Sequence, residues 1–368
     1  MNNNINIGIV GIGNCASSLV QGLQYYKDIV DNEKIIPGLI HPVLGGYKIS
    51  DIRIVACFDI DRRKVGKDIG KAIFAEPNCT KMFCSVPNLN VEVLKTCTFD
   101  GVAKHMQEMF LVDNNQKELT SEQIVKLLKE KQTDILINYL PVGTQMGTNY
   151  WTDIALYSGC AFVNCIPVFV ASNKEIVEKF KNANLPIIGD DIKSQCGATI
   201  LHRAIINMLV DRGAKIISTY QTNIGGNTDF ANMISETRLT SKRISKTESV
   251  SSQIPYKTPV YAGPNGYIAS LKDNKICNIR IDFDIFGDIP CSIDCKLSVE
   301  DSPNSAGIVI DCIRLAKIAK DRKIGGVLLG PSAWTMKHPP EQIKDEDARK
   351  QLEDFIDKDY MRYILYRK

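Results

Sequence analysis

Several features that would point to particular protein classes are missing from this chain of 368 residues. It has no run of about 18 uninterrupted apolar residues, so we expect no membrane span. Its net charge of +3 is too small to indicate binding to nucleic acid or to a membrane surface. Residues 1–10 lack the basic and apolar regions of a secretory signal. We therefore expect a cytoplasmic protein that binds neither nucleic acid nor membranes.

The 12 cysteines are scattered and include no CxxC pair. Such spacing favours reduced, buried thiols over disulfides or a zinc site. The histidines are few, and no spaced set of His, Cys and Asp residues indicates a metal centre. Because 44% of the residues are hydrophobic, a sizeable core is expected.

What the first half does contain is an alternation of strand-like and helix-like segments. Thr120 and Gln123 form a predicted capping box for one of the helices. Buried strands alternating with helices are typical of a parallel sheet covered on both faces. The predicted strands lie at 5–10, 52–61, 134–143, 161–172 and 185–191.

After Gly213 the pattern changes. Residues 215–226 and 278–300 alternate apolar and polar side chains, which indicates a sheet with one open face. A long helix is predicted to return at 305–323, and the basic segment 360–368 to be a docked terminus. We predict an α/β protein with a Rossmann-like parallel-sheet domain and an inserted β-rich α+β domain for catalysis and oligomerisation. The predicted boundaries are 1–198 completed by 306–368, and 199–305 for the insertion.

The turn after the first strand carries the pattern G-x-G-x-x-A at Gly11, Gly13 and Ala16. Gly11 permits a tight turn, Gly13 leaves room for a pyrophosphate, and Ala16 lets the helix pack closely on the strand. The helix N-terminus supplies free N–H groups for the phosphates. The alternative is a turn with no ligand. Because the turn joins a strand to a helix, we predict dinucleotide binding.

Asp59, at the end of the second strand, is the acid expected to bind the adenosine ribose. Asp61 and Asp68 are competitors for this role. An acid here favours NAD, because it would repel the 2′-phosphate of NADP. Arg62 and Arg63 follow directly and leave NADP as an alternative.

Two polar clusters suggest a substrate site. One is "GDDIKSQCGAT" (189–199), which places Asp190, Asp191, Lys193 and Ser194 after a strand, at the sheet edge where ligands bind in open α/β folds. The other is "SKRISK" (241–246), where Lys242 and Lys246 share a helix face and repel unless an anion lies between them. A helix cap with a surface ion pair, and a solvated basic face, are the alternatives.

Two further residues are candidates for the same site. Asp301 begins the returning helix, with Asn304 or Ser305 as its cap, and could serve capping alone. Lys337 lies in an apolar loop stopped by two prolines, where burial would lower its pKa, although an exposed loop lysine fits the pattern equally. Lysines stabilise phosphate, alkoxide and enolate charge, so the set suits redox chemistry on a phosphorylated polyol or sugar. An ordinary NAD(P) dehydrogenase and a non-catalytic NAD-binding protein are the alternatives.

The chain resembles the inositol-3-phosphate synthase family, and in particular its shorter bacterial and archaeal branch. The resemblance rests on "GIGNCASSLVQGLQYY", "NYLPVGT", "FVNCIPVF", "GDDIKSQCGAT", "NIGGNTDF", "SKRISKT" and "DSPNSAG", in this order. It implies conversion of D-glucose 6-phosphate to 1D-myo-inositol 3-phosphate, the first step of inositol and inositol-phospholipid synthesis. The implied steps are oxidation at C5 by NAD, enolisation at C6, aldol closure onto C1 and reduction by the same NADH.

The resemblance also implies site residues and an assembly. Catalytic roles fall on Lys242, Lys246, Lys337, Asp191 and Asp301, and substrate contacts on Lys193, Ser194, Asn227 and Asp229. Cofactor contacts are expected from Gly11, Gly13, Asn14, Cys15, Asp59, Asp68, Pro141, Asp190 and Ser194. The family implies a homotetramer formed through the middle sheet.

One departure concerns a lysine that long eukaryotic members carry after a Gly-Asp pair. Here Gly287 and Asp288 are followed by Ile289 and Pro290. Lys296, Arg280, or a divalent or monovalent cation are the alternatives for that role.

Overall fold

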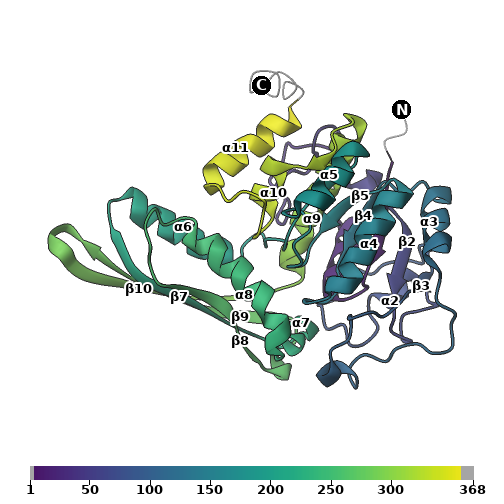
Figure 1. Cartoon of the computed structure of the whole chain (residues 1–368), viewed down its shortest axis with the longest axis horizontal. Coiled ribbons are helices and arrows are strands. Elements are labelled where there is room, and N and C mark those ends of the chain that lie inside the picture. Colours follow the sequence, from purple (N-terminus) through teal and green to yellow (C-terminus); the bar gives the residue numbers. More distant parts are fainter. Residues whose placement is uncertain (1–3, 358–368) are drawn as a thin grey trace.

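The computed structural model describes residues 4–357, and the basic segment 360–368 lies outside the described residues. Two sheets organise the chain (Figure 1). The first is a seven-stranded sheet in the order β11-β6-β5-β4-β1-β2-β3, and each of its strand pairs is parallel. Its strands are β1 (Ile5–Val10), β2 (Ile52–Asp59), β3 (Val93–Lys95), β4 (Ile135–Asn138), β5 (Ala161–Asn164), β6 (Pro186–Ile188) and β11 (Gly326–Val327).

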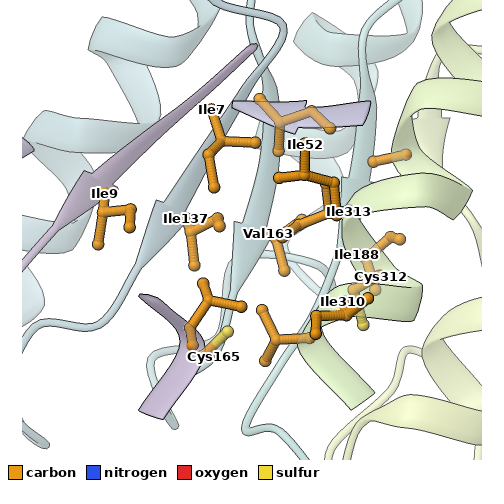
Figure 2. Close-up of a cluster of buried hydrophobic side chains, with 14 of the residues drawn as sticks. Ile7, Ile9, Ile52, Ile137, Val163, Cys165, Ile188, Ile310, Cys312 and Ile313 are labelled. Atoms are coloured by element: carbon orange, nitrogen blue, oxygen red, sulfur yellow. The ribbon is translucent and has the colours of Figure 1, made fainter. Parts of the chain in front are cut away.

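Helices cover both faces of this sheet, as the sequence predicts. The hydrophobic cluster on one face includes α1 (Asn14–Tyr25) and α9 (Pro303–Asp321). Figure 2 shows Ile137 and Val163 from the strands close to Ile310 and Ile313 from α9. The cluster on the other face includes residues of α3 (Ser121–Glu130), α4 (Gln145–Ser158) and α5 (Lys174–Asn182). The predicted Rossmann-like fold is confirmed.

The strand order reverses beside β1, which has β2 on one side and β4 on the other. In open α/β sheets, ligands bind at the carboxyl ends of the strands at such a switch point. β1 ends at Val10, directly before the glycine-rich turn. The fold therefore places that turn where a dinucleotide is expected.

The second sheet has four strands in the order β10-β9-β7-β8, and in Figure 1 it extends away from the first. Its strands are β7 (Lys215–Gly225), β8 (Val260–Tyr267), β9 (Asn274–Ile285) and β10 (Ile289–Glu300). Two helices, α6 (Ala198–Asp211) and α8 (Glu236–Ser251), pack on one face, where alternate residues of β9 are buried. The period-two alternation in the sequence arises from this one-sided packing.

Several predicted boundaries differ from the structure. The strands predicted to end at 61, 172 and 191 end at Asp59, Asn164 and Ile188. The helix α9 begins at Pro303 with Ser302 as N-cap, whereas the sequence predicts Asn304 or Ser305 as the cap. Pro303 at the first helical position needs no hydrogen bond for its nitrogen, which favours the earlier start. The strand β4 ends at Asn138. The side-chain nitrogen of Asn138 donates to Asn164 Oδ1, and its side-chain oxygen accepts the backbone N–H of Leu140.

Four shorter or later helices complete the described chain. They are α2 (Ile69–Ala72), α7 (Thr228–Asn232), α10 (Leu329–Thr335) and α11 (Asp345–Ile356). Among residues 4–357, no helix is both long and apolar enough to span a bilayer.

Candidate active site

The glycine-rich turn between β1 and α1 has the geometry of a phosphate-binding loop. Gly11 has a φ of +87°, and a Cβ there would lie 2.7 Å from the carbonyl oxygen of Tyr139. Gly13 precedes α1 as its N-cap, provides no side-chain cap, and a Cβ there would meet no atom within 4 Å. The space beside the N-terminus of α1 is therefore open. The first N–H groups of a helix bind phosphate, so this space fits the pyrophosphate of a dinucleotide.

This turn opens into a cavity of about 220 Å³ that most of the predicted site residues line. The cavity runs from the turn to the second sheet, so the predicted cofactor and substrate residues share one space. The predicted residues that line it are Gly11, Gly13, Asn14, Cys15, Asp59, Pro141, Ser194, Asn227, Asp229, Lys242, Lys246, Asp301 and Lys337.

At the end of β2, the carboxylate of Asp59 is held by backbone N–H groups. Its Oδ2 accepts from Ile12 at 2.7 Å, and its Oδ1 accepts from Ile60 at 2.7 Å and from Asp61 at 2.9 Å. Asp59 therefore ties β2 to the glycine-rich turn and still faces the cavity. The neighbouring Arg63 is engaged elsewhere, because it forms an ion pair with Asp61.

Two residues at the start of α1 contribute to the same wall. The Asn14 side-chain oxygen accepts the N–H groups of Cys79 and Thr80, at 2.7 and 3.2 Å. Burial, with Asp301 nearby, raises the pKa of the Cys15 thiol to about 12. Cys15 therefore stays protonated and serves as a small, inert lining group.

The centre of the lysine-rich wall is Asp191, which is fully buried at the end of β6. Its Oδ1 accepts hydrogen bonds from Lys242 at 2.9 Å and Lys337 at 3.1 Å. Its Oδ2 accepts the hydroxyl of Ser245 at 2.6 Å. One carboxylate thus joins α8 of the second sheet to the loop after α10.

This pairing decides the charges of the three groups. Burial alone would raise the pKa of Asp191, but Lys242 and Lys337 outweigh it and hold the pKa below its usual value. Burial would lower the pKa of Lys242, but Asp191 and Asp229 raise it above the ordinary range. For Lys337 burial prevails over Asp191, and its pKa is lowered. Lys242 is therefore a fixed cation, and Lys337 gives up its proton more readily.

Lys246 differs from the other two because it has no ion-pair or hydrogen-bond partner for Nζ within residues 4–357. It lies one helical turn after Lys242 on α8 and is 6% exposed. Burial lowers its pKa to about 7, and the nearby Lys275, Lys242 and Lys337 add to the effect. A buried lysine that lines a cavity without a counter-ion is suited to an anionic ligand.

Lys275 also belongs to the candidate site, although the sequence did not predict it. It lies at the start of β9, lines the cavity and forms an ion pair with Asp301. Lys296, one of the expected substitutes for the family lysine, is exposed on β10, and Arg280 pairs with Asp282 and Asp294 outside the cavity. The sequence signal that could have revealed Lys275 is a lysine at an inward position of a strand whose residues alternate between buried and exposed.

Asn227 and Asp229 line the same cavity, and Asp229 lies close enough to Lys242 to raise its pKa. The Asn227 oxygen caps α7 by accepting the N–H groups of Asp229 and Phe230, and its amide donates to Asp273 at 3.0 Å. Asp273 also accepts the backbone N–H and the hydroxyl of Ser302. This buried carboxylate therefore connects the starts of α7 and α9. Burial raises its pKa to about 6.

Four predicted site residues do not line the cavity, and one of them is Asp191, which contacts Lys242 and Lys337. Asp68 caps α2 through the N–H of Gly70 and also accepts from Leu89 and Val91. Asp190 turns into the fold, where Asn164 and Ala171 donate to it. Backbone and amide donors thus hold both side chains within the fold.

Lys193 is the fourth of these residues, and its side chain points away from the lysine-rich wall. Its Nζ donates to the carbonyl oxygen of Ala333 at 2.7 Å and lies 3.4 Å from Asp345. Asp345 also binds Arg203 through two hydrogen bonds of 2.9 and 2.8 Å. This buried cluster fastens α11 to α6 and to the segment that carries Asp191.

The described residues do not fit a metal ion. Among residues 4–357, no group of three or more His, Cys, Asp and Glu side chains is placed to hold one. We therefore assign no residues to a cation. Five lysines line the cavity and supply positive charge around it: Lys64, Lys242, Lys246, Lys275 and Lys337.

Comparison with known proteins extends over nearly the whole chain. The family model for myo-inositol-1-phosphate synthase matches residues 197–302. The inositol-3-phosphate synthase of Mycolicibacterium smegmatis is 45% identical over 360 residues, which cover 96% of this chain and 98% of that protein.

Two solved structures have the same fold. A structure named Ari2 superposes with a TM-score of 0.78 at 32% identity, covering 96% of this chain and 98% of that one. The inositol-3-phosphate synthase of Caenorhabditis elegans superposes with a TM-score of 0.72 at 17% identity, covering 96% and 85% of the two chains. At that identity, the second likeness concerns the fold alone.

Proposed function

The chain belongs to the inositol-3-phosphate synthase family, and from that premise we propose how its residues carry out the reaction. The chain converts D-glucose 6-phosphate to 1D-myo-inositol 3-phosphate and uses NAD. One observation carries the assignment of residues: Lys242, Lys246, Lys275 and Lys337 line a cavity that is continuous with the glycine-rich turn. Bound NAD would accept a hydride from the substrate and return it, which leaves no net redox change.

Lys242 acts as a fixed cation in this proposal. Its pKa is raised because Asp191 and Asp229 outweigh the effect of burial, so it stays charged through the cycle. A permanent ammonium stabilises negative charge that develops on a substrate oxygen, such as the C1 carbonyl oxygen during ring closure.

Lys337 is our candidate for the proton of the C5 hydroxyl. Its pKa is lowered by burial, and its Nζ donates to Asp191 and to the carbonyl oxygen of Ile192 at 2.6 Å. A lysine with a lowered pKa can take a proton when C5 is oxidised and return it when the ring ketone is reduced.

Lys246 is assigned to the phosphate of the substrate. It is buried, lines the cavity and has no carboxylate partner in the described part of the chain. A phosphate beside it would raise its pKa from about 7 and fix the ammonium. Lys275 and Asp301 form a pair on the same wall, where Lys275 adds positive charge for the substrate oxygens.

We further propose a homotetramer that uses the open face and the hairpin end of the second sheet. Exposed apolar side chains gather at the turn between β9 and β10: Ile285 is 44%, Phe286 97% and Ile289 57% exposed. Such a cluster favours a protein interface. We assign residues 1–198 with 306–368 to cofactor binding and 199–305 to catalysis and assembly, and we propose a cytoplasmic location.

The experiment that tests the function uses purified protein with D-glucose 6-phosphate and a catalytic amount of NAD. Inositol phosphate is followed by NMR and NADH by absorbance. We expect inositol phosphate without accumulation of NADH. NADH that accumulates in step with product would instead identify an ordinary dehydrogenase.

A further inference from the structure

Lys64 is a buried cation that the reaction described above leaves without a role. It follows β2, is 2% exposed and lines the same cavity as Gly11 and Gly13. Lysine is almost never fully buried unless its charge is paired. The contacts of its ammonium group therefore indicate what it is placed to bind.

The Nζ of Lys64 donates one hydrogen bond, to Asn78 Oδ1 at 3.0 Å. The amide of Asn78 donates to the carbonyl oxygens of Ile12 and Ile73, which fixes its oxygen toward the lysine. Asp59 Oδ2 lies 4.0 Å from the ammonium, beyond hydrogen-bond distance. An ammonium has three donors, so two remain without a partner among residues 4–357.

Asp59 does not accept a hydrogen bond from Lys64, because its carboxylate oxygens accept backbone N–H groups of the glycine-rich turn and of the residues after β2. Three backbone N–H groups, from Ile12, Ile60 and Asp61, take most of its acceptor capacity. Asp59 and Lys64 thus stand side by side on the cavity wall, one as acceptor and one as donor. This is the end of the second strand, where the adenosine ribose of a dinucleotide is bound.

We propose that Lys64 determines the cofactor preference of this chain: it donates to ribose oxygens of the adenosine half and offsets the repulsion of Asp59 toward a 2′-phosphate. This inference rests on the proposed function in one respect, namely that the cofactor is a nicotinamide dinucleotide. Its consequence is that the protein binds NADP measurably, although more weakly than NAD. Asp59 without Lys64 beside it would repel the 2′-phosphate and exclude NADP far more strictly.

Binding titrations without any sugar phosphate test this inference. NADH binding is followed by its fluorescence, and NAD and NADP are measured by displacement. In Lys64→Met we expect NAD to bind about 10-fold more weakly, since a hydrogen bond to a ribose oxygen is lost. NADP should bind about 100-fold more weakly, since it also loses a charge-assisted hydrogen bond to its 2′-phosphate. Lys67→Met is the matched control, because Lys67 is exposed on the same loop and outside the cavity.

Three results would overturn the proposal. They are a wild-type protein that binds no NADP, unchanged affinities in Lys64→Met, and equal losses for the two cofactors. An equal loss would put the lysine on the phosphates that both cofactors share. The first result needs no variant, so a Lys64→Met protein that fails to fold leaves the test intact. Because no substrate is present, failure of the cyclisation reaction would not alter the result.

Discussion

Lys242 and Lys337 donate hydrogen bonds to one and the same oxygen, Oδ1 of Asp191, at 2.9 and 3.1 Å. One lysine comes from α8, which packs on the second sheet, and the other from the loop after α10. Asp191 follows the β6 strand of the parallel sheet. This cluster therefore forms only when α8, the loop after α10 and the segment after β6 are folded together.

Replacing Asp191 by asparagine should remove the counter-charge of both lysines. The pKa values of Lys242 and Lys337 would then fall, because the main group that raises each of them is lost. We expect kcat to drop about 100-fold or more, with NADH binding nearly unchanged. The matched control is Asp190→Asn, whose side chain lies outside the cavity and can keep accepting from Asn164 and Ala171. Equal losses in the two variants would contradict this role for Asp191.

The pKa of Lys246 predicts how substrate capture depends on pH. Burial lowers this pKa to about 7, so the free enzyme carries the cation below pH 7 and loses it as the pH rises. Since kcat/KM reports the free enzyme, its value for D-glucose 6-phosphate should decline above that pH.

The variant Lys246→Met tests the assignment of this decline. It should lose the decline and have a kcat/KM about 10- to 100-fold lower at pH 6.5, because one charged contact to phosphate is missing. Steady-state kinetics from pH 6 to 9 measure both effects. Lys257→Met, at an exposed position, serves as the control. A variant that keeps the wild-type pH profile would assign the decline to another group.

Lys193 should behave as a stabilising residue and not as a substrate ligand. In Lys193→Met the carbonyl of Ala333 loses its donor, and Asp345 keeps only Arg203 in this cluster. We expect the free energy of unfolding to fall by about 1–3 kcal/mol while KM for D-glucose 6-phosphate stays unchanged. Urea unfolding and steady-state kinetics separate the two. A raised KM for D-glucose 6-phosphate in Lys193→Met would instead assign Lys193 to the substrate site.

The proposed tetramer should depend on Phe286, which is 97% exposed at the β9–β10 turn. A charge in this apolar cluster would be buried at an interface, so Phe286→Asp should lower the molar mass measured by light scattering. Ile35→Asp is the control, since Ile35 is 98% exposed in the segment between α1 and β2, outside the second sheet. A wild-type mass of one chain, or an unchanged mass in Phe286→Asp, would exclude this interface.

Local patterns were sufficient to predict the elements that build the site. The turn at Gly11 and Gly13 follows from strand, glycine spacing and helix, and the structure places it at the switch point of the sheet. The capping box at Thr120 and Gln123 is confirmed, because both of its hydrogen bonds are local. The α/β class follows from the same alternation of segments.

The direction of single side chains was not predictable in the same way. Asp190 and Asp191 are adjacent in the sequence, yet Asp190 turns into the fold and Asp191 toward the lysines. Lys193 belongs to the same motif and points to Asp345 on α11. Lys275 was overlooked because its partner, Asp301, comes from the far end of β10.

By itself, then, the sequence determined the α/β class, the dinucleotide turn and the family motifs, since each depends on residues within about one element of one another. Tertiary structure decided which charges meet. Asp191 accepts from lysines of two distant segments, and Lys64, which lines the cavity, makes a single hydrogen bond through its ammonium group within residues 4–357. The physical reason is that burial and pairing set the charge and pKa of a side chain, and both depend on neighbours brought together only by folding.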